Sequence, residues 1–197
     1  MIRQSVCVVL DTSGSMMEMG KIETVEYLLG YLFESMDVAD PAPPFARLRW
    51  LDGNCPQSPG EWQASTLAPV LKPDGQGFSP ALFEALQQEI DTQGCVAIML
   101  LSDGAFASDP WRCWLRDCPV PVHVVMIGAD AQEAPLRQLF GKACVFQGEA
   151  IDQAWRYWPQ PGERAIRPPV SFGAALAYVM AGEASAVAGV CTDDEWN

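Results

Sequence analysis

Short runs of consecutive apolar residues alternate along this chain with longer segments in which apolar residues recur every three or four positions. The continuous runs span residues 6–10, 95–101 and 120–127, and such runs suit strands that are buried on both faces of a parallel sheet. The helical spacing is clearest over residues 21–36, which we expect to form an amphipathic helix docked on that sheet. Strands that alternate with helices indicate parallel strands joined by right-handed crossovers.

Weaker patterns extend this alternation. Apolar and basic residues alternate over 46–51, which predicts a strand with one less buried side. We expect Asp109 to cap the helix that follows it. The other expected elements are a possible edge strand at 61–66, a short strand at 143–146, and helices after Ser79 and over 111–116, 132–140 and 150–158. The chain is therefore predicted to be α/β, a single Rossmann-like domain with a mostly parallel central sheet and helices on both faces.

A break in the pattern sets the predicted domain boundary. Prolines and a glycine over 159–162 end the alternation, because proline cannot continue a helix. We expect the domain to cover residues 1–158. We expect residues 159–197 to form a C-terminal extension that packs on the domain or binds a partner, with an acidic and flexible end at Asp193-Asp194-Glu195.

Composition narrows the classes of function. Apolar residues make up 49% of the chain and charged residues 19%, a balance typical of a soluble globular protein. The net charge of −13 argues against nucleic acid, whose phosphates need a basic surface, and against anionic membranes. The N-terminus lacks the pattern of a secretory signal, and no apolar run approaches the ~20 residues that span a bilayer. Cysteines in apolar settings, such as Cys7, Cys95 and Cys144, indicate reduced thiols and a cytoplasmic protein.

The first strand ends at a carboxylate that is followed by hydroxyls at alternate positions. Asp11, Ser13 and Ser15 stand two apart in a turn that Gly14 allows to bend sharply. Asp11 marks the carboxyl end of the strand, where open α/β sheets place their ligand sites. One carboxylate and two hydroxyls offer the hard oxygen donors that Mg²⁺, Mn²⁺ or Ca²⁺ prefers. A surface turn of small residues would share this spacing, so the motif needs support from elsewhere in the chain.

The segment Asp11-Thr12-Ser13-Gly14-Ser15-Met16 resembles the Asp-x-Ser-x-Ser signature of von Willebrand factor A (VWA) domains. In that family this signature is the first of three loops that form the metal-ion-dependent adhesion site (MIDAS). Gly77-Phe78-Ser79-Pro80-Ala81-Leu82 is similar to the second loop, with Ser79 where the family usually has threonine. Ser79 is also a good helix cap, so capping and metal ligation compete as explanations.

The third loop of the resembled site has a match after the second buried strand, at Ser102-Asp103-Gly104. The resemblance covers about residues 1–158 and implies five metal ligands: Asp11, Ser13, Ser15, Ser79 and Asp103. An isolated Asp-Gly pair is usually a plain turn, but here three loops match in the right order. We therefore expect the five side chains to meet at one edge of the sheet.

The resemblance implies a function as well as a fold. In the VWA family a partner's acidic residue completes the coordination of the ion. This implies a non-enzymatic protein-binding module with Mg²⁺ (or Mn²⁺ or Ca²⁺) as cofactor and a protein partner that supplies a carboxylate. Stand-alone cytosolic VWA proteins of this size resemble bacterial accessory subunits, whose relatives work beside AAA+ ATPases or with kinase and phosphatase partners.

Other functions stay open at this point. Asp11 invites comparison with metal-dependent phosphohydrolases of the haloacid-dehalogenase type, but Ser13 stands where those enzymes need a second carboxylate. His123 is the one histidine and lies in an apolar strand, so we expect a structural role and little general-base capacity. A scaffold that keeps the loops without depending on metal is a third possibility. A further hypothesis is that the acidic residues 193–195 supply the missing carboxylate to the ion of the same chain or of a neighbouring one.

Overall fold

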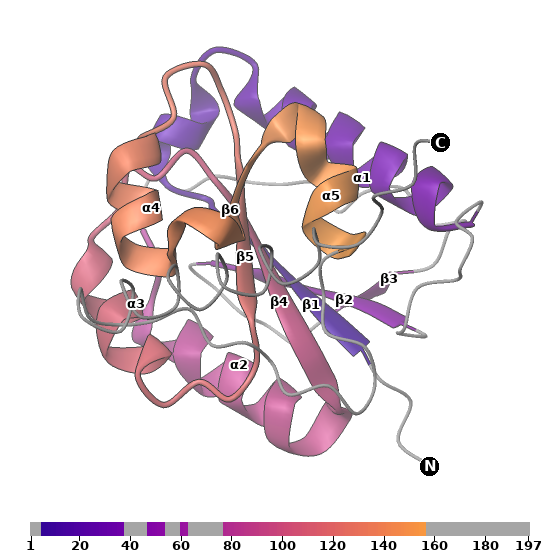
Figure 1. Ribbon diagram of the computed structural model, residues 1–197, viewed down its shortest axis with the longest axis vertical. Coiled ribbons are helices and arrows are strands. Elements are labelled where there is room, and N and C mark those ends of the chain that lie inside the picture. Colours follow the sequence, from indigo (N-terminus) through magenta and orange to yellow (C-terminus); the bar gives the residue numbers. More distant parts are fainter. Residues whose placement is uncertain (1–4, 38–46, 54–59, 63–76, 157–197) are drawn as a thin grey trace, which may run out of the picture.

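The computed structural model describes residues 5–37, 47–53, 60–62 and 77–156 of the chain. These residues form a six-stranded sheet with the order β3-β2-β1-β4-β5-β6 (Figure 1). The strands are β1 (Ser5–Leu10), β2 (Arg47–Asp52), β3 (Gly60–Trp62), β4 (Cys95–Ser102), β5 (Val122–Met126) and β6 (Val145–Gln147). Only β3, at one edge of the described sheet, runs antiparallel to its neighbour. The prediction of a mostly parallel sheet is confirmed.

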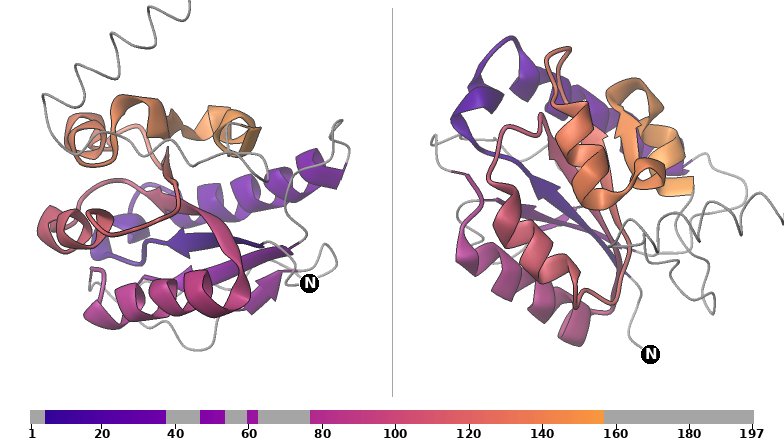
Figure 2. Two further views of the ribbon diagram at one scale, coloured as in Figure 1. Left: turned by 60° about the horizontal axis from the view of Figure 1, so that its bottom comes forward. Right: turned by 60° about the vertical axis from the view of Figure 1, so that its left-hand side comes forward.

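Helices cover both faces of this sheet, as the sequence predicts. α1 (Lys21–Asp37) and α5 (Ile151–Arg156) pack on one face, and the opposite face carries α2 (Pro80–Gln93), α3 (Ser108–Leu115) and α4 (Glu133–Phe140). Figure 2 shows α1 and α2 on opposite sides of the sheet. Short 3-10 turns occur at η1 (Gly14–Met17), η2 (Lys142–Cys144) and η3 (Gly148–Ala150).

The continuous apolar runs supply two separate cores. In β1, Val6, Val8 and Leu10 face α1 and α5, whereas Cys7 and Val9 face the other three helices. Successive side chains of a strand point to opposite faces, so a strand between two helical layers must be apolar at every position. All six residues of β1 are buried. Trp111 of α3 is fully buried in the second core, where its ring lies edge-on to several neighbouring aromatic rings.

An ion pair joins β2, the strand with basic residues, to α2. Arg49 of β2 is half-buried and forms an ion pair with the buried carboxylate of Glu89 on α2. Its Nη2 atom donates to Glu89 Oε1 over 3.1 Å. The predicted strand at 46–51 is thus present as β2, and the charge of its Arg49 is compensated by one acidic residue of the covering helix.

One detail of the sequence prediction is wrong, and three others cannot be compared with the structure. α3 begins at Ser108, so Asp109 lies inside its first turn and pairs with Arg112 over 2.9 Å. The prediction that Asp109 caps this helix is therefore wrong. The boundary at residue 158, the extension 159–197 and residues 63–66 lie outside the described residues.

The side chains of Cys95, Cys144 and His123 are buried in the interior of the domain. Burial raises the pKa of the Cys95 thiol to about 12 and that of Cys144 to about 11, as expected for cysteines that pack as small apolar residues. His123 is buried, and its Nδ1 atom lies 2.6 Å from the carbonyl oxygen of Ala154 on α5. Among the described helices, none is both long and apolar enough to span a bilayer.

Candidate metal site

The site lies where the two central strands end. β1 and β4 are parallel neighbours, and the chain runs outward from β1 in one direction before it returns to β4 on the other side. Such a reversal of strand order is the position where open α/β sheets bind ligands. The backbone N–H of Asp11 donates to the carbonyl of Leu101 over 3.0 Å. The first and third loops predicted from the sequence therefore leave the sheet side by side.

Asp11 is fixed by its own chain. The side chain is 1% exposed. Its Oδ1 atom accepts the backbone N–H of Ser13 over 2.9 Å, and its Oδ2 atom accepts the hydroxyl of Ser102 over 2.5 Å. Burial raises the pKa of Asp11, and these hydrogen bonds, which favour the charged carboxylate, limit that rise. Because Asp11 follows β1 and Ser102 ends β4, the second bond also joins the two loops.

Two hydroxyls stand beside this carboxylate at a spacing that suits a small cation. The Oγ atoms of Ser13 and Ser15 form a hydrogen bond with each other and lie 3.1 Å apart. Two neighbouring ligands of an octahedral Mg²⁺, each at 2.0–2.1 Å from the ion, are separated by roughly 3 Å. The turn therefore holds these two oxygens close to the separation that shared coordination requires.

The hydroxyl of Ser79 does not cap the helix that follows it. It occupies the cap position before α2, with Pro80 next, but its side chain makes no capping hydrogen bond. Its Oγ atom is shielded from solvent and has no hydrogen-bond partner among the described residues. A shielded hydroxyl without a partner costs free energy. Of the two explanations left open by the sequence, capping by the side chain is wrong, and ligation stays a prediction.

The loop of Ser79 is attached to the same edge through the end of β2. The backbone N–H of Ser79 donates to the carbonyl of Gly53 over 3.0 Å, and the N–H of Gly53 donates to the carbonyl of Leu10 over 2.9 Å. A side chain at Gly53 would meet the ring of Phe78 at 2.7 Å. The glycine thus allows the second loop to approach the end of β1.

Asp103 is buried and already has a cationic partner. Its Oδ1 atom accepts the backbone N–H of Ala105 over 2.9 Å, and its Oδ2 atom accepts the ammonium of Lys21 over 2.8 Å. Lys21 also pairs with Asp130 over 2.8 Å. Burial alone would lower the pKa of Lys21, but these two carboxylates outweigh that effect and raise it. The hydrogen bond from Lys21 lowers the pKa of Asp130.

Lys21, Ser102 and Asp130 are site residues that the sequence reasoning missed. Lys21 was recognised only as the start of a helix, although it stands four residues before Val25 on the buried stripe of α1. A lysine on the apolar stripe of an amphipathic helix indicates a buried charge with a partner, because an unpaired one would be costly. Ser102 stands in the segment that resembles the third loop, but nothing in the sequence indicates that it pairs with Asp11, and Asp130 has no comparable indication.

The residues present fit a divalent cation. Asp11, Ser13 and Ser15 share one turn, hydrogen bonds join this turn to the β4 loop, and the Ser79 hydroxyl on the adjoining loop has no partner among the described residues. In the part of the chain that the structure describes, no three His, Cys, Asp or Glu side chains gather in one place. A cation here would depend on hydroxyls as well as on carboxylates. This donor set, made of oxygen alone, suits Mg²⁺, Mn²⁺ or Ca²⁺ better than a softer metal.

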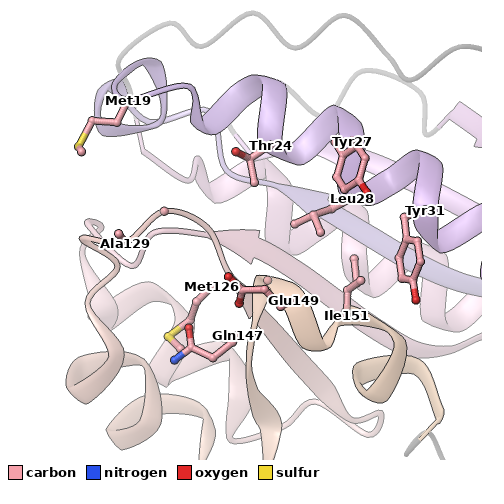
Figure 3. Close-up of a pocket in the computed structure, with 12 residues that line it drawn as sticks. Met19, Thr24, Tyr27, Leu28, Tyr31, Met126, Ala129, Gln147, Glu149 and Ile151 are labelled. Atoms are coloured by element: carbon pink, nitrogen blue, oxygen red, sulfur yellow. The ribbon is translucent and has the colours of Figure 1, made fainter.

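A groove lies to one side of this edge. It has a volume of about 620 Å³ and runs between α1 and the segment that joins β6 to α5. Figure 3 shows Tyr27 and Tyr31 of α1 across from Glu149 and Ile151. Met19, in the connection between η1 and α1, also lines the groove and is 78% exposed. The groove is thus partly apolar, and its lining residue Gly128 lies against Lys21 of the candidate site.

Comparisons with known proteins bear on the fold. No protein-family model and no curated protein matches this sequence. The solved structure of an aerotolerance-related membrane protein from Bacteroides fragilis, with multiple mutations to serines, is similar to this chain with a TM-score of 0.51. The likeness covers 77% of this chain and 98% of that one at 15% sequence identity. The fold is VWA-like.

Two structures of proximal thread matrix protein 1 from the mussel byssus are also similar, at 13% identity over 79% of this chain and 46% of theirs. Their TM-scores are 0.49 and 0.47, and the second has a zinc-occupied MIDAS motif. Likenesses at this level carry no inference about the chemistry of this chain. What the VWA-like domain binds has to be argued from its own residues.

Proposed function

We propose that this chain is a non-enzymatic protein-binding module that depends on a divalent metal ion. The observation that carries the proposal is the shielded Ser79 hydroxyl, which has no partner among the described residues and lies on a loop attached to the end of β1. Asp11, Ser13, Ser15, Ser79 and Asp103 would hold the ion. Mg²⁺ is the proposed cofactor, with Mn²⁺ or Ca²⁺ as substitutes, because all five donors are oxygen atoms.

The charges and hydrogen bonds of the site favour binding of a cation and, through the cation, of an acidic group from outside. When bound, the cation would attract an acidic group from outside, because two carboxylates and neutral hydroxyls leave it positively charged. Ser102 and the Ser13 N–H hold the Asp11 carboxylate in one orientation. The burial of Asp11 and Asp103 strengthens their attraction for a cation, since charges interact more strongly away from water.

A protein is the proposed source of that acidic group. Met17 and Met19 follow the Asp11 turn and are 65% and 78% exposed, and exposed methionines are common on adaptable protein-binding surfaces. The chain itself carries a net charge of −13, which repels an acidic partner in the absence of a cation. The ion therefore supplies the attraction that makes such a contact specific.

The cellular setting rests on the resemblance to the VWA family. We propose a cytoplasmic accessory subunit of a bacterial multi-protein system, acting beside an AAA+ ATPase or with kinase and phosphatase partners. The alternative, a metal-dependent phosphohydrolase that uses Asp11, has no specific observation in its favour. Ser13 stands where such an enzyme needs a second carboxylate as its acid or base.

Metal-dependent capture tests this proposal. The full chain is immobilised and exposed to bacterial lysate in Mg²⁺ or in EDTA, beside the Asp11→Ala variant and a Ser108→Ala control. We expect a retained protein that is lost both in EDTA and with Asp11→Ala, but kept by the control. Capture that is equal in EDTA and Mg²⁺ would contradict the proposal, as would phosphatase or ATPase turnover that disappears in Asp11→Asn.

A further inference from the structure

Lys21 stands inside the candidate metal site as a fixed positive charge. It is the first residue of α1, its side chain is 1% exposed, and its ammonium lies 2.8 Å from both Asp103 Oδ2 and Asp130 Oδ2. Gly128 makes room for the lysine stem, because a Cβ atom there would approach Lys21 Cε to 2.7 Å. The backbone of Gly128 has a φ of +88°, which favours glycine. The arrangement is therefore built by three segments that are far apart in the sequence.

We propose that Lys21 is the resident cation of this site, so that a divalent ion binds Asp103 only in competition with the Lys21 ammonium. This inference rests on the proposed function and concerns the control of metal affinity at the same site. Lys21 is a positioning residue in this account: it acts on the ion through Asp103 and is not itself a ligand. The site then has two states. In one, the Lys21 ammonium alone compensates the negative charge of Asp103, and in the other the site holds the metal ion.

Competition follows from the atoms involved. The oxygen of Asp103 that faces Lys21 is occupied by a charge-assisted hydrogen bond, and its other oxygen accepts a backbone N–H. A divalent ion that draws on Asp103 must weaken the first bond and must also tolerate the nearby ammonium, which repels it. Both effects lower the affinity of the site for metal.

Asp130 gives the lysine a second place to pair. Its side chain is 45% exposed, whereas the side chain of Asp103 is 3% exposed. A buried ammonium that lost its only partner would be strongly unfavourable. With Asp130 present, Lys21 stays paired while Asp103 turns to the metal. Removing Asp130 would leave Asp103 as the one acidic partner that the described structure shows for this ammonium, and would also remove a negative charge near the ion.

These roles predict opposite effects for two substitutions. Lys21→Met removes the competing cation and keeps the apolar stem, so we expect the Kd for Mg²⁺ to fall at least about tenfold, equivalent to about 1.4 kcal/mol. Asp130→Asn ties Lys21 to Asp103, so we expect the Kd to rise. Lys142→Met is the matched control, because it removes an exposed lysine and changes the net charge by the same amount.

The experiment is calorimetric titration of the full-length proteins with Mg²⁺ and Mn²⁺, with thermal unfolding measured in metal and in EDTA. We expect Lys21→Met to have a lower Tm than wild type in EDTA, since Asp103 loses its partner, and a larger rise in Tm on addition of metal. Lys142→Met should match wild type. Should Lys21→Met prove too unstable to titrate, the increase in Kd of Asp130→Asn decides the question.

The outcomes separate this inference from the proposed function. Metal binding by wild type that is unchanged in both Lys21→Met and Asp130→Asn would overturn the inference and leave the proposed function standing. Absence of metal binding in wild type and in both variants would overturn the two together. Tight binding by Lys21→Met with weak binding by wild type is the result that the competition requires.

Discussion

At the scale of single residues, hydrogen bonds between loops decide the shape of the site. Ser102 donates to the buried Asp11 carboxylate and accepts the N–H of Gly104 over 2.9 Å. It thus satisfies two groups that would otherwise be buried without partners. Lys21, which lies 82 positions away in the sequence, likewise donates a hydrogen bond to the buried carboxylate of Asp103. Contacts of this kind depend on the folded topology, which is why the motif Asp11-Thr12-Ser13-Gly14-Ser15 was readable from the sequence and these partners were not.

The Ser102→Ala substitution tests the first of these contacts. It leaves a buried carboxylate oxygen and a backbone N–H without their partner, so we expect a loss of about 1–3 kcal/mol in the free energy of unfolding. Urea unfolding of the two proteins at neutral pH measures this difference. Ser108→Ala, at the start of α3, should change stability by less than about 0.5 kcal/mol. Equal stability of Ser102→Ala and wild type would show that the bond to Asp11 does not hold the loops.

At the scale of elements, the sequence predicted what lies inside a strand or helix better than where it ends. The buried strands were recognisable because β1 and β4 are apolar except for one terminal serine each, as two covering layers of helix require. The start of α3 was misplaced because its first turn is polar, and Asp109 is compatible both with a cap and with the first helical turn. Element ends are set by local hydrogen bonds that composition does not specify.

His123 of β5 contacts the carbonyl of Ala154 on α5 and makes stability depend on pH. Burial lowers its pKa from the ordinary value of about 6.5, so the folded chain resists protonation of the ring while the unfolded chain accepts it. The contribution of His123 to the free energy of unfolding is fully present above about pH 6.5. This contribution is lost progressively as the pH falls from that value toward the lowered pKa. The slope reaches at most about 1.4 kcal/mol per pH unit.

The measurement is urea unfolding of wild type and His123→Phe between pH 7.5 and 5. The other titratable groups are the same in both proteins, so the difference between the two curves isolates the histidine. We expect the wild-type free energy of unfolding to fall more steeply on acidification than that of His123→Phe. Parallel curves would contradict a neutral, buried His123.

At the scale of the whole molecule, topology and charge act together. The strand order places the Asp11 and Asp103 loops at the reversal point of the sheet, which is a general consequence of a VWA-like arrangement of strands and crossovers. The net charge of −13 gives a cation a long-range attraction to this domain. The fold and the position of the Asp11 turn at the end of β1 were thus predictable from the sequence, whereas metal ligation by that turn stays a prediction. The pairing of Lys21 with Asp103 and Asp130, on which the proposed control of the ion rests, depends on distances between segments that only the folded chain brings together.

The central claim is that loops from three parts of the chain hold one divalent ion. Calorimetric titration of Mn²⁺ into wild type and Ser79→Ala tests it most directly. The loop of Ser79 is joined to the end of β1 through the backbone of Gly53, and the Ser79 hydroxyl has no hydrogen-bond partner among the described residues. We predict binding of a single ion by wild type and at least about tenfold weaker binding by Ser79→Ala, with unchanged binding by Ser108→Ala. Equal affinity of wild type and Ser79→Ala for Mn²⁺ would contradict the account.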